Sequence, residues 1–378
     1  MKATFNRDSL NKSLMFLQSG MPAKPIVPVD GYIKFVIKEN KASIFIANQK
    51  VQMKSYNKVE SEDEFTFVVP RDKICNVINN FPSEAVKLSA KLKDDDVNSI
   101  VITGSGKKRY SINCLPSNEF AEFPNVEQTI LDEITFDMGT YNKDIRDACN
   151  NVSVNETRVS MQNMIMVPDE HGKMLMAGLS EFKSFLRQTD IPFKARVHIS
   201  PEIGSYIRSL TESGECYMKI GSNQIHIVYG SNEIWTKAVD GNVFSFESIL
   251  TTEDDRYIIL NRKDFLSALG RLESFKSAKS SSVIVSIKGN ELLMEGENFA
   301  GNATEDLEIT NEDEVDIRIA FNVSQVRQIA SNFEGDTIRM SVKAYKAPIF
   351  FRCNDNPNTK IWMTSQVVMP KLSQEHSE

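Results

Sequence analysis

The chain has 378 residues, of which 41% are hydrophobic and 25% charged, and its formal net charge is -7 at pH 7. This length suits two or three domains of ordinary size. No apolar stretch is long enough to span a bilayer, and the opening MKATFNRDSL is too polar for a signal peptide, so we expect a cytoplasmic protein with no membrane partner. The acidic balance excludes a protein that holds nucleic acid by phosphate affinity alone, because such proteins are usually basic.

Amphipathic helices are predicted at six places along the chain. Apolar residues recur there at i, i+3, i+4 and i+7 or a part of that spacing, which puts them on one helix face. The six sets are Leu10, Leu14 and Leu17; Ile74, Val77, Ile78 and Phe81; Ile145, Ala148, Cys149 and Val152; Ile203, Tyr206, Ile207 and Leu210; Phe265, Ala268, Leu269 and Leu272; and Val326, Ile329, Ala330 and Phe333. Corresponding sets recur about 125 residues apart, so the chain contains a threefold repeat with two helices in each unit.

The rest of each repeat alternates as antiparallel strands do. RYSINCLP, NQIHIVYG with IWTKAV, and VIVSIKGNELLMEG with a turn at Gly289 are examples. Many strands with two helices per repeat predict an α+β fold in which the helices cover one face of antiparallel sheets. We expect domain boundaries near EQTILDE and SFESIL, which gives domains at 1–128, 129–247 and 248–378, the last with a short C-terminal tail.

Cysteine, histidine and acidic residues show no catalytic pattern. The five cysteines lie far apart without a C-x-x-C pair, and the four histidines lack metal-ligand spacing. GSGKKRY lacks the spacing of a phosphate-binding loop, and the acidic runs at 94–96, 253–255 and 312–314 have turn-like surroundings. We therefore expect no catalytic residue, no metal and no cofactor. A metal-dependent, nuclease-like accessory enzyme for DNA processing stays open as the alternative.

Several dispersed segments carry a family resemblance. They are MKATFNRDSLNKSLMFLQSGMPAKPIVPV, KKRYSINCLPSNEFAEFPN, VDGNVFSFESIL, FNVSQV and the final VVMPKL. Together, and in register with the threefold repeat, they resemble the bacterial sliding clamp, the beta subunit of DNA polymerase III. The altered peptide cleft described below is typical of a divergent bacterial clamp or one encoded by a phage.

The resemblance implies a head-to-tail homodimer in which two chains of three domains close a ring of six around duplex DNA. Twelve helices packed about 9 Å apart would form a ring about 35 Å across at the helix axes, which leaves at least about 25 Å for the duplex. Because topology holds such a ring on DNA, weak contacts with phosphate suffice and the acidic balance of the chain is no obstacle. The implied role is a processivity factor without a catalytic site.

Basic residues on the lining helices and one loop are the candidates for contact with DNA, and Lys24-Pro25 matches a basic-Pro pair in the family's loop near the DNA. The second domain reads SPEIGS where the family tends to carry basic residues, so we expect its lining to be less positive. The candidates are Arg7, Lys12, Lys24, Arg71 and Lys73 in the first domain; Lys143, Arg146, Arg158 and Arg208 in the second; and Arg262, Lys263, Arg271 and Arg327 in the third.

The resemblance also implies a hydrophobic cleft that takes short peptides from the replicative DNA polymerase, the clamp loader and other proteins with a clamp-binding motif. Its candidate residues are Met161, Leu179, Phe244, Ser248, Ile249, Val367, Val368, Met369 and Pro370. Ser248 replaces a usual arginine and Phe244 a usual proline, so we expect an altered peptide preference. The dimer contact is predicted at Tyr110 and Ile112 on an edge strand, and at Leu272 and Phe275 near the end of a helix.

Overall fold

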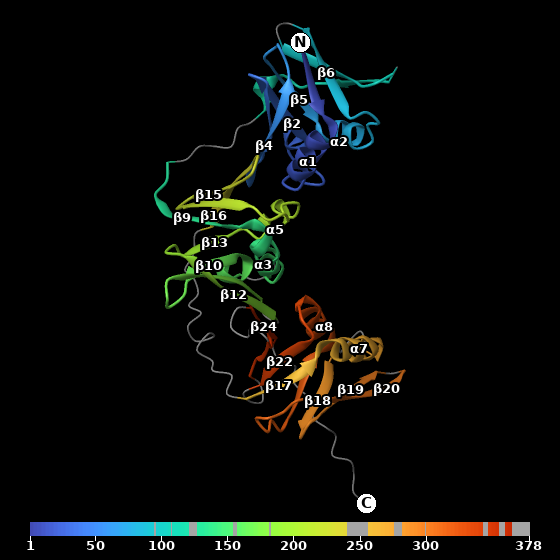
Figure 1. Ribbon diagram of the computed structural model, residues 1–378, viewed down its shortest axis with the longest axis vertical. Coiled ribbons are helices and arrows are strands. Elements are labelled where there is room, and N and C mark those ends of the chain that lie inside the picture. The colour runs from blue at the N-terminus through green and yellow to red at the C-terminus, as the bar shows by residue number, and fades with distance from the viewer. Residues whose placement is uncertain are drawn as a thin grey trace, which may run out of the picture. The chain divides into compact units, whose positions relative to one another are not determined.

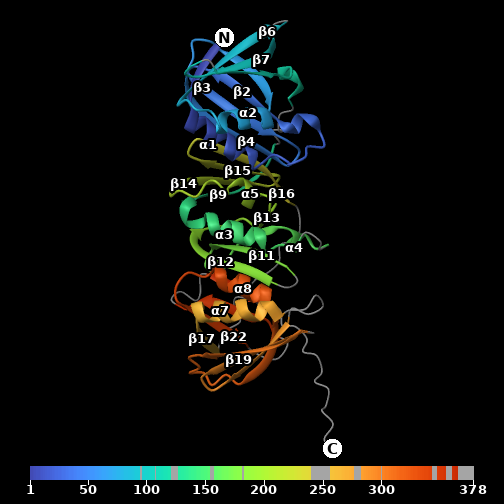
Figure 2. The same ribbon diagram turned by 90° about the vertical axis from the view of Figure 1, so that its right-hand side faces the viewer.

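Figures 1 and 2 show the computed structural model of the chain. It describes residues 1–93, 96–106, 108–120, 127–153, 157–180, 183–239, 256–275, 282–298, 300–342, 347–354 and 360–364. Within these ranges no helix is long and apolar enough to cross a membrane. The chain divides into two compact units, Met1–Cys149 with Ile191–Asp240, and Asn150–Asp190 with Gly241–Glu378. The middle repeat therefore contributes to both units, and the three domain boundaries stay a prediction.

One order of elements occurs three times: a strand, a helix, four strands, a helix and three strands. The first repeat consists of β1 (Lys2–Asn6), α1 (Arg7–Gln18), β2 (Tyr32–Lys38), β3 (Lys41–Ala47), β4 (Val51–Glu60), β5 (Phe65–Pro70), α2 (Arg71–Asn79), β6 (Ala85–Lys93), β7 (Asp96–Thr103) and β8 (Arg109–Asn113). Two short 3-10 turns, Pro28–Gly31 and Ser117–Glu119, lie in its loops.

The second repeat follows the same order with one extra turn of helix, α4. Its elements are β9 (Ile130–Asp137), α3 (Met138–Asn150), α4 (Val159–Gln162), β10 (Met164–Pro168), β11 (Lys173–Leu179), β12 (Lys183–Pro192), β13 (Val197–Ile199), α5 (Ile203–Tyr206), β14 (Glu215–Gly221), β15 (Gln224–Tyr229) and β16 (Asn232–Val239).

The third repeat again has two helices among its strands. Its elements are β17 (Tyr257–Asn261), α7 (Arg262–Leu272), the 3-10 turn η3 (Glu273–Phe275), β18 (Ser282–Lys288), β19 (Glu291–Asn298), β20 (Gly301–Glu308), β21 (Ile317–Asn322), α8 (Val323–Asn332), β22 (Thr337–Val342), β23 (Ile349–Cys353) and β24 (Lys360–Thr364). The predicted turn at Gly289 joins β18 to β19, with Gly289 at φ +56°. The α+β fold with two helices in each repeat is confirmed.

Antiparallel pairing links strands of different repeats within each unit. In the first unit the order is β5-β2-β3-β4-β16-β15-β14-β9, so the sheet of the first repeat continues into the second repeat where Met53 lies opposite Ile234. A further sheet has the order β1-β6-β7-β8. In the second unit, β12 pairs with β24 in the order β12-β24-β23-β22-β17, and β20-β19-β18-β21 form a separate sheet.

The helices bury the apolar faces that the sequence predicts. Leu10, Leu14 and Leu17 of α1 are at most 1% exposed, and α1 packs beside α2 over β3, β4 and β5. In the third repeat α7 packs beside α8 in the same manner. An asparagine precedes α1, α7 and α8, and each side chain accepts a hydrogen bond from the backbone three residues on, which caps the helix start.

The second helix of the middle repeat is shorter than its spacing predicts. α5 spans only Ile203–Tyr206, although Ile203, Tyr206, Ile207 and Leu210 are all buried. Gly204 lies within α5 at a close approach to α3, where a Cβ would lie 2.9 Å from the Cβ of Cys149. The close approach of the two segments requires glycine, and glycine is a poor helix former.

Candidate nucleic-acid interface and partner-binding surfaces

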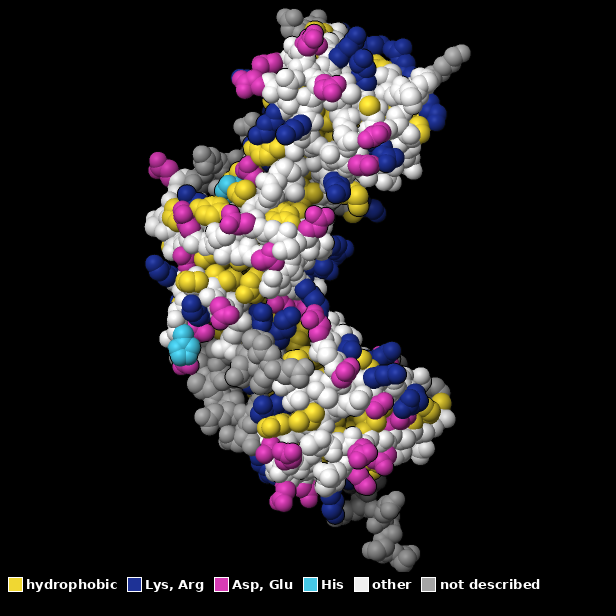
Figure 3. Space-filling model, in the orientation of Figure 1, with side chains coloured by type: hydrophobic (Ala, Val, Ile, Leu, Met, Phe, Trp, Pro, Cys, Tyr) yellow, Lys and Arg dark blue, Asp and Glu magenta, His cyan; other side chains and the backbone are white. Residues whose placement is uncertain are grey.

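Two strands of opposite charge lie at the edges of their sheets. Among the described residues, β8 pairs only with β7, and β20 pairs only with β19. Exposed Arg109 begins β8 and exposed Lys108 precedes it, whereas β20 carries the exposed Asp306 and Glu308. Figure 3 shows Lys and Arg side chains gathered where the first unit carries β6, and Asp and Glu side chains gathered over strands of the third repeat. Each edge thus presents unpaired backbone groups beside charges of one sign.

The four residues predicted at the dimer contact lie near these edges in different environments. Tyr110 is 41% exposed and packs edge to face on Phe81, with ring centroids 6.1 Å apart. Phe275 is half-buried. Ile112 and Leu272 are 6% and 1% exposed, so their side chains belong to the cores of their own repeats. Their assignment to a dimer contact stays a prediction. Because both side chains are buried, the two residues could contact a second chain only through their backbone or through neighbouring side chains.

Four exposed lysines in the first and third repeats are among the predicted DNA contacts. Lys12 lies on α1, Lys24 in the loop after α1, Lys73 on α2 and Lys263 on α7. Within the part of the chain that the structure describes, none of these four ammonium groups makes a hydrogen bond or an ion pair. Each therefore keeps its full capacity to bind an anion.

Arg7 and Arg262 occupy equivalent positions, each as the first residue of the first helix in its repeat. Arg7 Nη1 donates to the carbonyl oxygen of Phe81 at 3.0 Å, just beyond the end of α2. Arg262 Nε donates to the carbonyl of Ala330 at 3.2 Å, and its Nη2 donates to Ser331 at 3.4 Å, at the end of α8. Both arginines thus satisfy carbonyl groups at the C-terminal end of the partner helix. Their contact with DNA stays a prediction.

In the middle repeat, an asparagine takes the place of the arginine and binds the carbonyl groups that follow the second helix. Met138 stands where the other repeats have arginine, and the side-chain amide of buried Asn142 donates to the carbonyl oxygens of Ile207 and Leu210, both at 2.7 Å. The start of α3 is capped by Asp137, whose Oδ2 accepts from the backbone and hydroxyl of Thr140 at 2.7 Å. The predicted DNA contacts Lys143, Arg158 and Arg208 are exposed, and Arg146 is half-buried.

In the third repeat, the other two predicted arginines are paired with glutamates. Arg271 Nε and Nη2 donate to the two carboxylate oxygens of Glu305 on β20, at 2.6 and 2.7 Å. Arg327 of α8 forms an ion pair with Glu273, directly after α7. These guanidinium groups are partly exposed but have intramolecular anions as partners.

Arg71 holds the loop that presents Lys24. Its Nη1 donates to the carbonyl of Pro22 at 2.8 Å and its Nη2 to Ala23 at 3.5 Å, while Nε pairs with Asp72 at 2.8 Å. Only 14% of the Arg71 side chain is exposed. The predicted DNA contact at Arg71 thus has a structural role in positioning its neighbour.

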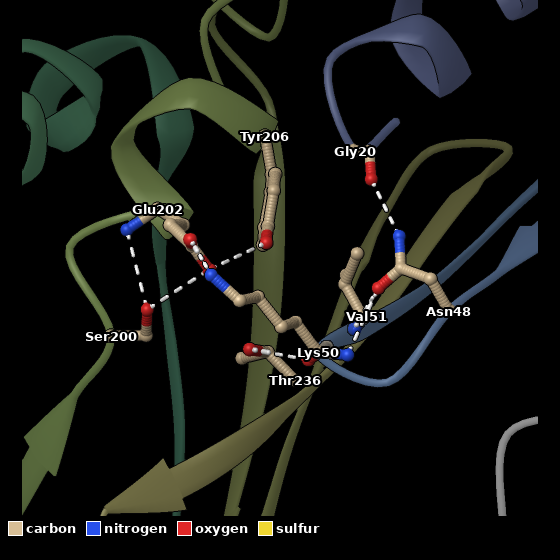
Figure 4. A network of polar contacts seen from close by, with 8 residues as sticks. All are labelled: Gly20, Asn48, Lys50, Val51, Ser200, Glu202, Tyr206 and Thr236. Atoms are coloured by element: carbon tan, nitrogen blue, oxygen red, sulfur yellow. Dashed lines mark hydrogen bonds and ion pairs between the residues drawn. The ribbon is translucent and has the colours of Figure 1, made fainter. Parts of the chain in front are cut away.

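A polar network supports the same loop from the second repeat, within the first unit (Figure 4). Lys50 forms an ion pair with Glu202, whose carboxylate also accepts from the hydroxyl of Tyr206 at 3.2 Å. Asn48 Nδ2 donates to the carbonyl of Gly20 at 2.9 Å. A pocket of about 470 Å³ lies beside this network, and Ile26 on its rim is 97% exposed. Burial and the Glu202 charge raise the pKa of Tyr206, so the phenol stays a hydrogen-bond donor.

An apolar cluster in the second unit joins strands of the second and third repeats. It contains the predicted cleft residue Leu179, and the predicted Met161 packs against it. Its other members are buried and were not among the predicted cleft residues, although the alternation in MIMVP and KMLMAGL places several of them on one sheet face. These are Ile165, Val167, Leu175, Ala177, Leu186, Phe350, Ile361 and Met363. Pairing of β12 with β24 brings the two repeats together under this cluster.

The described thiol and imidazole groups lie apart from one another in the fold. Cys75, Cys149 and Cys216 are buried and form no disulfide, and burial raises the pKa of the Cys75 thiol to about 11. His198 is fully buried, which lowers its pKa, and His226 stacks on Trp235 at 4.4 Å. In the described ranges, no three His, Cys, Asp or Glu residues are placed to hold a metal ion.

Comparison with known proteins agrees with the fold. The family model described as DNA polymerase III beta subunit, N-terminal domain, matches residues 1–126. The beta sliding clamp of Bacillus subtilis is 24% identical over 392 residues, which covers 98% of this chain and 99% of that protein. The beta sliding clamp of Proteus mirabilis is 20% identical over 347 residues, or 90% of this chain and 92% of its own.

Solved structures match over nearly the whole chain. The DNA polymerase sliding clamp of Pseudomonas aeruginosa superposes with a TM-score of 0.87 at 15% identity, covering 98% of this chain and 100% of its own. The sliding clamp of Bartonella birtlesii bound to griselimycin gives 0.88 at 18% identity, with the same coverage. The chain is a divergent relative of the bacterial sliding clamps.

Most of the predicted peptide cleft lies outside the described residues. Seven of the nine predicted cleft residues fall outside them: Phe244, Ser248, Ile249, Val367, Val368, Met369 and Pro370. The cleft prediction therefore depends on Met161, Leu179 and the cluster around them.

Proposed function

We propose that this chain is a DNA sliding clamp that encircles duplex DNA as a ring-shaped homodimer and tethers the replicative DNA polymerase to it. The observation that carries the proposal is the threefold order of elements, with two helices per repeat, over the same length of chain as solved sliding clamps. Encirclement accounts for the net charge of -7, because a closed ring needs no strong affinity for phosphate. The helices would then line the hole.

The homodimer would form between the edge strands. β8 with Lys108 and Arg109 is basic, and β20 with Asp306 and Glu308 is acidic, so the β8 edge of one chain and the β20 edge of another attract each other. Antiparallel pairing across the contact would also satisfy the backbone groups that each edge leaves unpaired. Because each chain carries both edges, two chains close a ring with two equal contacts.

Partners would dock beside the buried apolar cluster of the second unit, at the side where half-buried Met161 packs against it. A cleft with apolar walls suits a short peptide with apolar or aromatic side chains, as expected of the clamp loader, the polymerase and other proteins with a clamp-binding motif. Half-buried Met161 can adapt to several related peptides because the methionine side chain is flexible. The absence of arginine at Ser248 would shift the preferred peptide sequence.

The clamp would act in the cytoplasm, without a catalytic site of its own. The comparisons give no support to the alternative of a metal-dependent accessory enzyme.

Retention on blocked DNA tests the proposal. The protein is loaded onto a linear duplex tethered by one end, the free end is blocked with a bulky protein, and the sample is washed at high salt. A clamp stays bound until the duplex is cut with a restriction enzyme, and sediments at about twice the 42.7 kDa chain mass. Loss of the protein in high salt while both ends are blocked, or a monomer at all concentrations, would contradict it.

A further inference from the structure

The predicted DNA contacts of the first and third repeats fall into two chemical groups. Each of the five arginines is held by the chain itself, through a carboxylate, a backbone carbonyl or both. These are Arg7, Arg71, Arg262, Arg271 and Arg327. The four lysines are exposed, and none has a polar partner among the described residues: Lys12, Lys24, Lys73 and Lys263. The division follows residue type, so the two groups differ in what they can offer to phosphate.

The strongest pairing lies on the helices of the third repeat, in what we name the α7–α8 charge cluster: Arg271, Glu273, Glu305 and Arg327. Arg271 and Glu305 form a fork-to-fork pair with two parallel hydrogen bonds at 2.6 and 2.7 Å. Arg327 pairs with Glu273, which also accepts from the hydroxyl of Ser324 at 2.7 Å. Two positive and two negative charges make the cluster neutral.

The glutamates lie deeper than the arginines that they bind. Glu305 and Glu273 are 16% and 21% exposed, whereas Arg271 and Arg327 are 59% and 49% exposed. Glu305 lies opposite Met294 in the β19–β20 pair, and Met294 is fully buried, so Glu305 is on the sheet face that α7 covers. The hydrogen bond from Arg271 lowers the pKa of Glu305, which keeps this carboxylate ionised at neutral pH.

A guanidinium group binds phosphate with the same fork of donors that it uses for a carboxylate. An arginine whose fork is already occupied by a fixed glutamate must break that pair before it can bind DNA. A free lysine has no such cost, and its ammonium group makes single contacts that exchange with water. Glu273 and Glu305 are therefore placed to decide how strongly the helices of this repeat hold a duplex.

We propose that Glu273 and Glu305 mask Arg271 and Arg327 from phosphate, so that exposed lysines make the contacts between the helices and the duplex. This inference rests on the proposed function, which brings DNA to the helices. Masking would keep the number of simultaneous phosphate contacts small. The ring could then slide with little friction, because each phosphate contact that breaks recaptures a counterion.

Glutamine substitution at the two masking positions tests the proposal by a gain of binding. Glu273→Gln and Glu305→Gln keep the side-chain shape but remove the charge that holds the arginine. The matched control is Glu295→Gln, which frees Arg318 from a 3.6 Å ion pair on the other face of the same sheet. Binding to a short duplex is measured by fluorescence anisotropy between 50 and 200 mM salt.

Each masking variant is expected to bind more tightly at low salt than Glu295→Gln, and to steepen the slope of log K against log salt by about 0.9. The double variant is expected to steepen it by about twice that amount. Sedimentation at the same concentrations verifies that the Glu305→Gln ring stays closed, because β20 lies at a sheet edge. Slopes equal to that of Glu295→Gln would overturn the proposal.

Loss-of-charge variants test the other half of the proposal. Arg327→Gln is expected to change duplex affinity by less than twofold, whereas Lys73→Gln and Lys263→Gln are each expected to weaken binding and flatten the salt slope by about 0.9. An arginine effect as large as the lysine effects would also overturn it. If the proposed clamp function itself is wrong, wild-type protein washes off blocked DNA. This result is independent of the variants and so is distinguished from a failure of the masking proposal.

Discussion

The side-chain amide of Asn142 donates a hydrogen bond to the carbonyl oxygen of Leu210 at 2.7 Å, and the same nitrogen reaches Ile207 at 2.7 Å. In the first and third repeats, Arg7 and Arg262 bind the equivalent carbonyls at the end of the second helix. The middle repeat thus replaces an arginine that can extend into solvent with a short, fully enclosed amide. One packing requirement, closure of the helix pair, has two chemical solutions in the same chain.

Asn142→Ala is expected to lower the free energy of unfolding by about 1 to 3 kcal/mol, because the buried carbonyl of Leu210 loses its donor, whereas the carbonyl of Ile207 keeps its hydrogen bond from the backbone of Leu210 at 2.8 Å. Asn150→Ala is the matched control on the same helix, since Asn150 is exposed. We expect this control to change stability by less than about 0.5 kcal/mol. Urea denaturation measures both variants, and equal losses would show that Asn142 only supports helix α3 in a general way.

Asp137 is expected to make stability sensitive to acid. Its carboxylate accepts hydrogen bonds from Thr140, Ser213 and the backbone of Gly214, which hold its pKa below the ordinary value of 3.8. The folded pKa is depressed, so this stabilisation is fully present above about pH 4 and is lost as the pH falls through the folded value.

Asp137→Asn should therefore be less stable than wild type at pH 7, with a difference that shrinks steadily below pH 4. The control is Asp264→Asn, because no side-chain hydrogen bond or ion pair of Asp264 occurs among the described residues. Thermal unfolding followed by circular dichroism between pH 2 and pH 7 measures both. A difference between Asp137→Asn and wild type that stays constant over this range would contradict the linkage.

Two glycines in helical segments are expected to respond to alanine in opposite directions. At Gly204 a Cβ would lie 2.9 Å from Cys149, so Gly204→Ala forces α5 away from α3 and should cost about 1 to 3 kcal/mol. At Gly270 in α7 the nearest atoms, those of the Arg327 guanidinium, are 3.6 Å away. Gly270→Ala should therefore gain up to about 1 kcal/mol from helix propensity. Urea titration of both proteins gives the comparison, and loss of stability in both would show that local space does not decide the sign.

Sequence periodicity predicted the elements whose formation depends on neighbours along the chain. The apolar faces of α1, α7 and α8 and the turn at Gly289 were predicted correctly, because the spacing of residues such as Leu10, Leu14 and Leu17 fixes a helix face locally. The length of α5 was predicted wrongly. This segment packs closely on α3 where Gly204 meets Cys149, 55 residues away, and no local pattern records that contact.

The sequence also does not show which of the predicted DNA contacts already have an intramolecular anion as partner. Sequence reasoning treats Arg271 and Lys263 alike, since both are cations on one predicted helix. Arg271 meets Glu305 only because β20 returns beside α7, 34 residues later in the chain. Lys263 finds no anion in the described part of the fold. Charge pairing depends on strand register and helix packing, so the sequence predicted the cationic residues but not which of them are already neutralised.

Reversal of charge at the edge strands gives a test of ring closure that a folding defect cannot mimic. Lys108→Glu with Arg109→Glu reverses the β8 edge, and Asp306→Lys with Glu308→Lys reverses the β20 edge. Each double variant alone brings like charges together at both contacts of the proposed dimer, so we expect it to sediment as a monomer where wild type is a dimer.

An equimolar mixture of the two double variants is expected to recover the dimer. In the mixed pair, the reversed β8 edge of one chain meets the reversed β20 edge of the other, and the two native edges meet at the second contact. Both contacts then join opposite charges again, whereas neither variant can pair with itself. Analytical ultracentrifugation at low salt measures the recovery, because interactions between exposed charges weaken as the Debye length shortens. A mixture that stays monomeric would show that the edges β8 and β20 do not meet in the ring.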